Sequence, residues 1–221
     1  MILENGVVRT LDRAADVVES LGISRELVVD GGAGERVDLD GCCVVPGFTD
    51  AHVHFPTWSI ARRQVRLEDC RTLEDAVARV SAAAGGASPD RWVLGFGWRS
   101  LDWTPARPPS RWDLDPVTGE VPVALRSKDG HSLWVNSAAL ARAGGELAVD
   151  GGVVETDALG EPTGVLREEA AWRFQKRLVH VSESAYVDAV RDGIAVAHAR
   201  GVTAVHDKDG GVGAVQIWQE L

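Results

Sequence analysis

The spacing of hydrophobic residues changes along this chain, and each change predicts a different kind of element. Short apolar runs broken by glycines occupy residues 1–46. They predict short strands, a hairpin turn at Asn5-Gly6 and a small antiparallel sheet layer. A proline and a glycine then redirect the chain into FTDAHVHF, residues 48–55, whose alternation predicts a strand.

Downstream of this strand, helical periodicity alternates with short apolar runs. Four segments are predicted to be helical: residues 72–85, 136–144, 165–178 and 182–201. Strands are predicted at residues 91–98, 121–127 and 201–207, with two short strands joined by a turn within 153–168. The proline-rich stretch TPARPPSRWDLDP, residues 104–116, is predicted to be a loop.

The order of the last helix and strand indicates the architecture. A helix leads directly into a strand, downstream of an earlier strand, and this is typical of parallel α/β folds. We therefore expect residues 48–54 and 201–207 to be adjacent parallel strands, with the intervening helix packed outside them. The stretch between the two strands is far longer than an ordinary crossover, which indicates an inserted domain.

Composition narrows the class of function. The formal net charge of −10 disfavours binding to nucleic acid or to an anionic membrane. The three cysteines are odd in number and two are adjacent, so we expect buried, reduced thiols and no disulfide framework. We see neither a signal peptide nor an apolar run of roughly 20 residues, which predicts a soluble, cytoplasmic protein.

His52 and His54 are the first candidates for chemistry. On a strand, this spacing places both imidazoles on one face, about 6.5 Å apart at the backbone. Two neutral imidazoles arranged in this way suit a divalent transition metal such as zinc. Asp50 lies on the same face and is a candidate to orient one imidazole. The alternative for the pair alone is two incidental histidines on a surface strand.

The surrounding sequence favours the metal. VVPGFTDAHVHF at 44–55 resembles the first barrel strand of the amidohydrolase superfamily. DGHSLWVNSAAL at 129–140, GEPTGVLREEA at 160–170 and GVTAVHD at 201–207 follow in an order similar to that of amidohydrolase family 3, which includes N-substituted formamide deformylases. The resemblance covers nearly the whole chain. It implies that His52 and His54 bind a metal at the mouth of a (β/α)8 barrel.

On this resemblance the fold class is α/β, a partial (β/α)8 barrel, and the chain divides into four parts. Residues 1–46 form the N-terminal part of a β-sandwich subdomain, and residues 47–58 are barrel strand one with both histidines. Residues 59–181 are a large α+β insertion domain. Residues 182–221 are a helix followed by barrel strand two.

The sequence also departs from the family. Family members carry a lysine, two histidines and a catalytic aspartate on later barrel strands, whereas this sequence ends at Leu221, soon after strand two. A complete barrel needs about 250 residues. We therefore expect a truncated chain, a fragment or one half of a split protein, with the general base located beyond Leu221. His52 and His54 alone leave a catalytic zinc short of its usual three protein ligands.

Four further residues are candidates for substrate contact or for support of the metal. The resemblance implies that His131 faces the substrate pocket; its alternative is a hydrogen-bonded histidine inside the insertion. Glu168 is a candidate polar or acid/base group, with the first turn of a helix as its alternative role. His206 and Asp207 end strand two, where a barrel places functional groups.

Two functions remain open. The first is a zinc-dependent hydrolase that cleaves C–N bonds in small amide or N-formyl compounds. The second is a non-catalytic remnant of such a hydrolase, which self-associates or binds a partner through unpaired strands. Six of the eight tryptophans fall within residues 59–181. We expect most of them in the core, and one or two lining an apolar pocket for a hydrophobic amide substituent.

Overall fold

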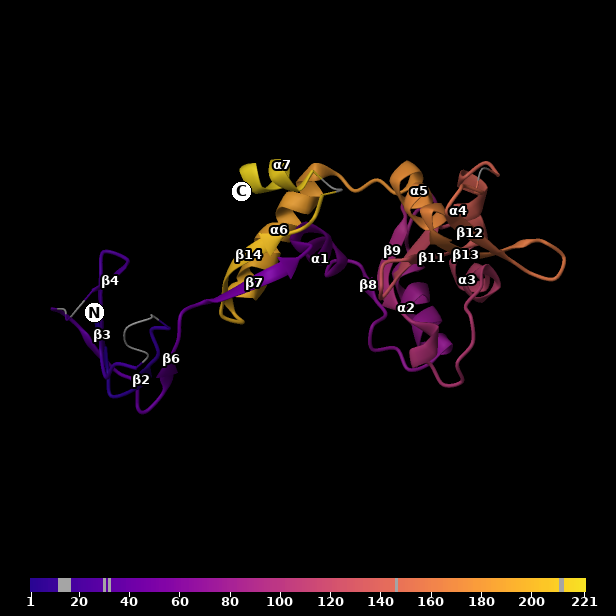
Figure 1. Cartoon of the computed structure of the whole chain (residues 1–221). Coiled ribbons are helices and arrows are strands. Elements are labelled where there is room, and N and C mark those ends of the chain that lie inside the picture. The colour runs from indigo at the N-terminus through magenta and orange to yellow at the C-terminus, as the bar shows by residue number, and fades with distance from the viewer. Residues whose placement is uncertain (12–16, 30, 32, 146, 211–212) are drawn as a thin grey trace. The chain divides into compact units, whose positions relative to one another are not determined.

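The computed structural model describes residues 1–11, 17–29, 31, 33–145, 147–210 and 213–221. These residues form two compact units. The first unit consists of Met1–His52 and Val196–His206, and the second of Val53–Ala195 and Asp207–Leu221. Figure 1 traces the chain through the elements of both units. Among the described residues, no helix is long and apolar enough to cross a membrane.

Six short strands belong to the first unit: β1 (Ile2–Glu4), β2 (Val7–Val8), β3 (Leu21–Ser24), β4 (Leu27–Val29), β5 (Arg36–Asp38) and β6 (Cys43–Val44). Four of them form a sheet in the order β4-β3-β1-β5, and β2 pairs separately with β6. Strand β1 runs antiparallel to β3 but parallel to β5, and β2 runs parallel to β6. The strand pairing is mixed, so the prediction of an antiparallel layer is wrong.

The predicted hairpin at Asn5-Gly6 is also wrong. Asn5 does have a positive φ of 59°, as a tight turn requires, but the strands on its two sides belong to different sheets. A Cβ at Gly6 would lie 2.6 Å from the Cys42 carbonyl oxygen, so only glycine fits there. The dipeptide therefore carries the chain from one sheet to the other past Cys42.

The first unit also contains most of two longer strands, β7 (Phe48–Val53) and β14 (Val202–Asp207). They are neighbours in a two-stranded sheet. The Phe48 N–H donates to the Gly201 carbonyl at 2.8 Å, and the Lys208 N–H donates to the Val53 carbonyl at 2.7 Å. The two ends are matched in the same order, so the strands run parallel. The prediction that these segments are adjacent parallel strands is confirmed.

A six-stranded sheet with the order β12-β13-β11-β10-β9-β8 supports the second unit. Its strands are β8 (Val65–Arg66), β9 (Val93–Trp98), β10 (Val123–Ser127), β11 (Ser132–Val135), β12 (Gly152–Thr156) and β13 (Pro162–Glu168). Strands β8, β9 and β10 run parallel, and the remaining pairs are antiparallel. Residues 165–168 were predicted to be helical. They extend β13 instead, because Val165 and Leu166 pair with β11.

The helices are α1 (Phe55–Ala61), α2 (Leu73–Ala84), the 3-10 turn η1 (Ser100–Asp102), α3 (Arg111–Thr118), α4 (Ser137–Arg142), α5 (Glu169–Leu178), α6 (Glu183–His198) and α7 (Ala214–Gln219). The predicted helix at 72–85 is confirmed as α2. The Thr72 hydroxyl accepts from the Asp75 N–H at 2.9 Å, and the Asp75 carboxylate accepts from the Thr72 N–H at 3.0 Å. This reciprocal pair fixes where α2 begins.

Helix α3 corrects the prediction of a loop over residues 104–116. Residues 104–110 have no regular structure, but a helix begins at Arg111 and includes Pro116. The Asp113 carboxylate accepts from both the N–H and the hydroxyl of Ser110, each at 2.7 Å. This cap supplies the helix start that the proline content of the stretch concealed.

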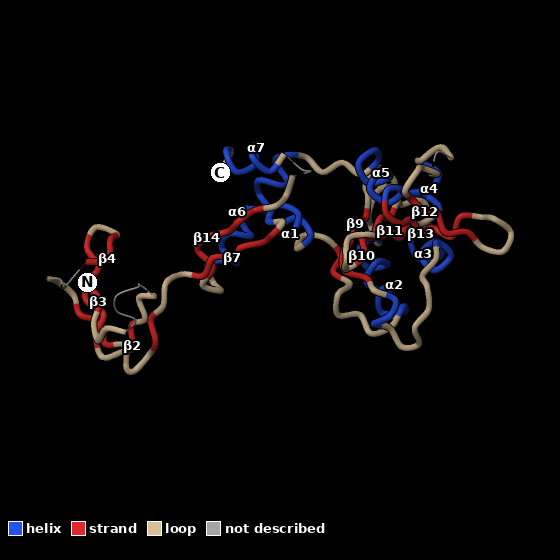
Figure 2. The backbone as a smooth tube through the Cα atoms, viewed as in Figure 1, coloured by secondary structure: helices blue, strands red, loops and turns tan. Residues whose placement is uncertain are grey.

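Two hydrophobic clusters lie on opposite faces of the six-stranded sheet. Alternate residues of β10 contribute to different clusters: Val123 and Leu125 to one, Ala124 to the other. The first cluster includes buried residues of α2 and α3, and the second includes buried residues of α4 and α5. The sheet is therefore covered by helices on both faces (Figure 2).

The expected core role holds for three of the six tryptophans within residues 59–181, whereas Trp112 and Trp172 are exposed. Trp98, Trp103 and Trp134 are buried, and their rings lie 6.2 to 6.4 Å apart. The cysteines behave differently from the prediction. Cys70 is buried, as expected, but Cys42 and Cys43 are exposed, the latter within the two-residue strand β6.

Candidate functional site

The predicted metal pair, His52 and His54, lies at the junction between β7 and α1. His52 belongs to β7, and His54 follows the strand directly as the N-cap residue of α1. Both histidines are exposed. The Asp50 carboxylate accepts from the His52 backbone N–H at 3.1 Å, so Asp50 supports the strand at the position of this histidine.

Two carboxylates, one from the last residue of β14 and one from just beyond it, hold the beginning of α1. The Asp207 carboxylate accepts from the Phe55 N–H at 3.1 Å, and the Asp209 carboxylate accepts from the Thr57 N–H at 2.8 Å. Asp207 also accepts from the Asp209 N–H at 3.0 Å and from the Trp218 indole N–H at 2.7 Å. Asp207 thereby fixes the backbone immediately after His54, and its contacts are those of a positioning residue.

His131 and Glu168 are brought together by the pairing of β11 and β13. Their side chains are hydrogen-bonded, with His131 Nδ1 at 2.9 Å from Glu168 Oε2. The Glu168 N–H also donates to the His131 carbonyl at 2.8 Å. The hydrogen bond to the Glu168 carboxylate raises the pKa of His131 above its ordinary value. The imidazole is exposed, and the Trp172 ring lies beside it at 5.5 Å between centroids.

The backbone of Glu168 is strained. Its φ of 53° and ψ of −129° lie in a region that residues other than glycine rarely adopt. Such a conformation costs on the order of 1–3 kcal/mol and recurs at functional sites. Here the strained backbone of Glu168 lies between β13 and α5, and its side chain bonds His131. The turn therefore fixes the position of the exposed His131–Glu168 pair.

His206 lies in β14 of the first unit and is exposed. Among the described residues, no group of three or more His, Cys, Asp or Glu side chains is arranged to hold a metal ion. A catalytic zinc usually has three protein ligands, so the imidazoles of His52 and His54 suit such a metal in kind but would account for only two of the three.

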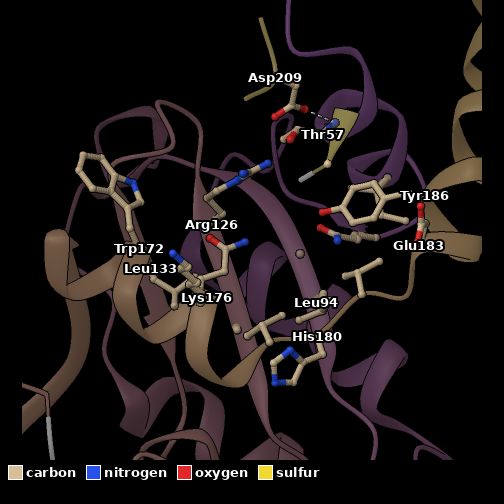
Figure 3. A pocket seen from close by; sticks show the side chains of 18 of the residues that line it. Thr57, Leu94, Arg126, Leu133, Trp172, Lys176, His180, Glu183, Tyr186 and Asp209 are labelled. Atoms are coloured by element: carbon tan, nitrogen blue, oxygen red, sulfur yellow. Dashed lines mark hydrogen bonds between the residues drawn. The ribbon is translucent and has the colours of Figure 1, made fainter. Parts of the chain in front are cut away.

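A pocket of about 650 Å³ in the second unit contains residues that the sequence analysis missed. Its lining includes Arg126, Tyr186 and Asp209, with Trp172 on its wall (Figure 3). The only signal for Arg126 was a charged residue within the apolar strand VPVALRS. Trp172 also lines this pocket, and the expected apolar pocket for an amide substituent stays a prediction.

A family model described as the amidohydrolase family matches residues 35–221. Relatives include the protein LONG AFTER FAR-RED 3 of Arabidopsis thaliana, 30% identical over 94% of this chain and 38% of its own length. The putative amidohydrolase YtcJ of Bacillus subtilis is 31% identical over 79% of this chain and 34% of its own length. The N-substituted formamide deformylase of Arthrobacter pascens is 32% identical over 77% of this chain and 34% of its own length.

Solved structures show the same fold. An uncharacterized metal-dependent hydrolase from Pyrococcus horikoshii OT3 superimposes with a TM-score of 0.70 at 24% identity, covering 100% of this chain and 45% of that one. A second from Pyrococcus furiosus has a TM-score of 0.69, with 46% of its chain covered. The chain spans between 34% and 40% of the length of the curated relatives that it matches.

Proposed function

Because this chain belongs to the amidohydrolase family, we propose that it forms part of a metal-dependent hydrolase that cleaves C–N bonds of the amide or N-formyl type. The observation that carries the proposal is the segment from Asp50 to His54. It lies within the matched residues, and it presents two exposed imidazoles at the end of a parallel strand. The relative named as an N-substituted formamide deformylase supports the choice of bond.

The fold gives this segment its proposed context. We assign β7 and β14 to the first two strands of a (β/α)8 barrel, because they are parallel neighbours with α6 between them in sequence. Residues 59–181 are then the insertion, residues 1–46 the sandwich portion, and residues 182–221 the helix with strand two. Active-site groups of such barrels lie at the carboxyl ends of the strands, where His54 and Asp207 occur.

In the proposed site, His52 and His54 hold the metal. Zinc is among the divalent ions that imidazole nitrogens suit. When bound, it polarises the substrate carbonyl and lowers the pKa of water to about 7. Asp50 steadies the backbone of His52, and Asp207 fixes the backbone that follows His54. His131, which Glu168 favours in its protonated form, is a hydrogen-bond donor for substrate.

Hydrolysis of N-benzylformamide by the purified chain tests the reaction class. We expect little or no formate release even with added zinc, far below the roughly 10 s⁻¹ of a median enzyme, because two imidazoles hold zinc less firmly than three ligands. Turnover that is unchanged after chelation contradicts the proposal. Turnover at the usual enzymatic level that His52→Ala abolishes shows instead that the chain carries a complete site.

A second candidate function is supported by the exposure of β7 and β14. Every residue of β7 except Val53 is exposed, as are three residues of β14. Strands of parallel sheets are normally covered on both faces. This favours a module that self-associates or binds a partner through these strands. Light scattering distinguishes the two states: a concentration-dependent rise in mass supports association, and a constant monomer mass argues against it.

A further inference from the structure

The pocket that contains Arg126 lies wholly within residues of the second unit. Strands β9, β10 and β11 and helices α1, α5 and α6 contribute to its walls. Ala124 and Leu133 are buried at these walls, and Leu94 is partly buried. The charged residues Lys176 and Glu183 are exposed. The pocket therefore combines apolar wall residues with charged and polar ones, as small-molecule sites do.

Arg126 is a partly buried cation without a polar partner among the described residues. Neither a hydrogen bond nor an ion pair joins its guanidinium to any of them, and its recorded contact is with the Phe96 ring, 5.2 Å away. Burial lowers the pKa of the Arg126 guanidinium from its ordinary value. Arginine nevertheless stays protonated, and Asp209 offsets its charge only by attraction at longer range, so an anionic ligand that bonds the guanidinium directly would stabilise it further.

Two neighbours of Arg126 define which anion fits. The Asp209 carboxylate lies beyond ion-pair distance of Arg126 and accepts from the Thr57 N–H at 2.8 Å. Tyr186 is partly buried, and burial raises the pKa of its phenol, so the hydroxyl stays protonated as a donor. Figure 3 shows the Arg126 guanidinium and the Tyr186 hydroxyl pointing into the same space.

We propose that this pocket binds a small molecule with one carboxylate attached to an apolar group. The planar guanidinium of Arg126 matches a carboxylate through two parallel hydrogen bonds, and the Tyr186 hydroxyl supplies a third donor. Asp209 and Glu183 repel a second negative charge, which selects a monoanion over a phosphate dianion. Leu94, Leu133 and Trp172 accommodate the apolar group. The assignment of this ligand does not depend on whether His52 and His54 bind a metal.

Phenylacetate, its uncharged analogue phenylacetamide and inorganic phosphate are suitable probes of the full chain. Ligand-observed NMR titration should show phenylacetate bound at least about tenfold more tightly than either phenylacetamide or phosphate. Phenylacetamide lacks the charge of the bidentate pair with Arg126. Phosphate lacks the apolar group, and its second charge is repelled by Asp209 and Glu183. This comparison uses the native protein and needs no variant. Equal affinity for phenylacetamide, tighter binding of phosphate, or no detectable binding of phenylacetate overturns the proposal.

Variants locate the binding. Arg126→Gln should weaken phenylacetate binding by at least about tenfold, and Tyr186→Phe should weaken it less. Lys128→Gln is the matched control, because Lys128 is an exposed cation just beyond β10 that pairs with Asp102 and does not line this pocket. Far-UV circular dichroism confirms that each variant is folded. Unchanged affinity in folded Arg126→Gln, or a loss in Lys128→Gln of the same size, contradicts the assignment.

Discussion

The His131 imidazole and the Glu168 carboxylate form a hydrogen bond of 2.9 Å between residues that are 37 positions apart in sequence. This contact raises the pKa of His131 above its ordinary value. A raised pKa stabilises the folded state below the unfolded value of about 6.5, and the stabilisation is lost as pH rises through the folded pKa. The pair therefore keeps His131 protonated to a higher pH than an ordinary histidine.

The first prediction concerns this titration. Glu168→Gln should return the pKa of His131 toward its ordinary value, because the amide carries no charge. The measurement is an NMR titration of the His131 ring protons. Glu169→Gln is the matched control, since Glu169 is the next residue and begins α5 without bonding His131. A His131 midpoint that is the same in the native protein and in Glu168→Gln contradicts the assigned cause.

The second prediction concerns Asp207. Asp207→Ala removes the acceptor of three donors, namely the N–H groups of Phe55 and Asp209 and the Trp218 indole. The free energy of unfolding should fall by about 1–3 kcal/mol, because groups that are partly buried lose a charged acceptor. Urea denaturation measures the change. The same experiment on Asp90→Ala, at an exposed position, should change the free energy of unfolding by no more than about 0.5 kcal/mol. An equal loss of stability in both variants would contradict the positioning role of Asp207.

The third prediction concerns the tryptophan core. Trp134 is fully buried, and its indole N–H donates to the Ser110 carbonyl at 2.8 Å. Trp134→Ala should therefore destabilise the second unit by about 3–5 kcal/mol through cavity formation. Trp112, which is 45% exposed, serves as the control, and Trp112→Ala should cost less than about 1 kcal/mol. Thermal unfolding of both variants makes the comparison, and similar losses would contradict the assignment of the core.

Local signals in the sequence predicted much of the fold. The Thr72–Asp75 capping box and the Asn136 cap mark α2 and α4 within a few residues, because caps are formed by neighbours in sequence. Strand partners are different, since pairing depends on tertiary contacts. Asn5-Gly6 has a turn conformation, yet the strand after it pairs with Cys43–Val44. The Ser110 cap of α3 was not predicted, because the proline-rich composition around it favoured a loop and the cap was a single short signal.

The candidate site was predictable only in part. Spacing and family resemblance identified His52 and His54 as a pair, and His131 and Glu168 as separate candidates. Their contact with each other depends on the register in which Ser132 pairs with Arg167, which the sequence does not encode locally. Arg126 escaped notice because a single charge in an apolar strand is also compatible with an exposed edge. Its partial burial, with no hydrogen bond or ion pair to any residue that the structure describes, is visible only in the structure.

The central claim is that His52 and His54 hold a divalent metal, and zinc titration against a chromophoric chelator tests it most directly. We expect one weakly held zinc, readily removed by chelation. His52→Ala and His54→Ala should each weaken it by at least about tenfold, since each removes one imidazole ligand. His198→Ala, which changes an exposed histidine at the end of α6, should leave the affinity within about twofold. Zinc affinity that is unchanged in both His52→Ala and His54→Ala would contradict the account.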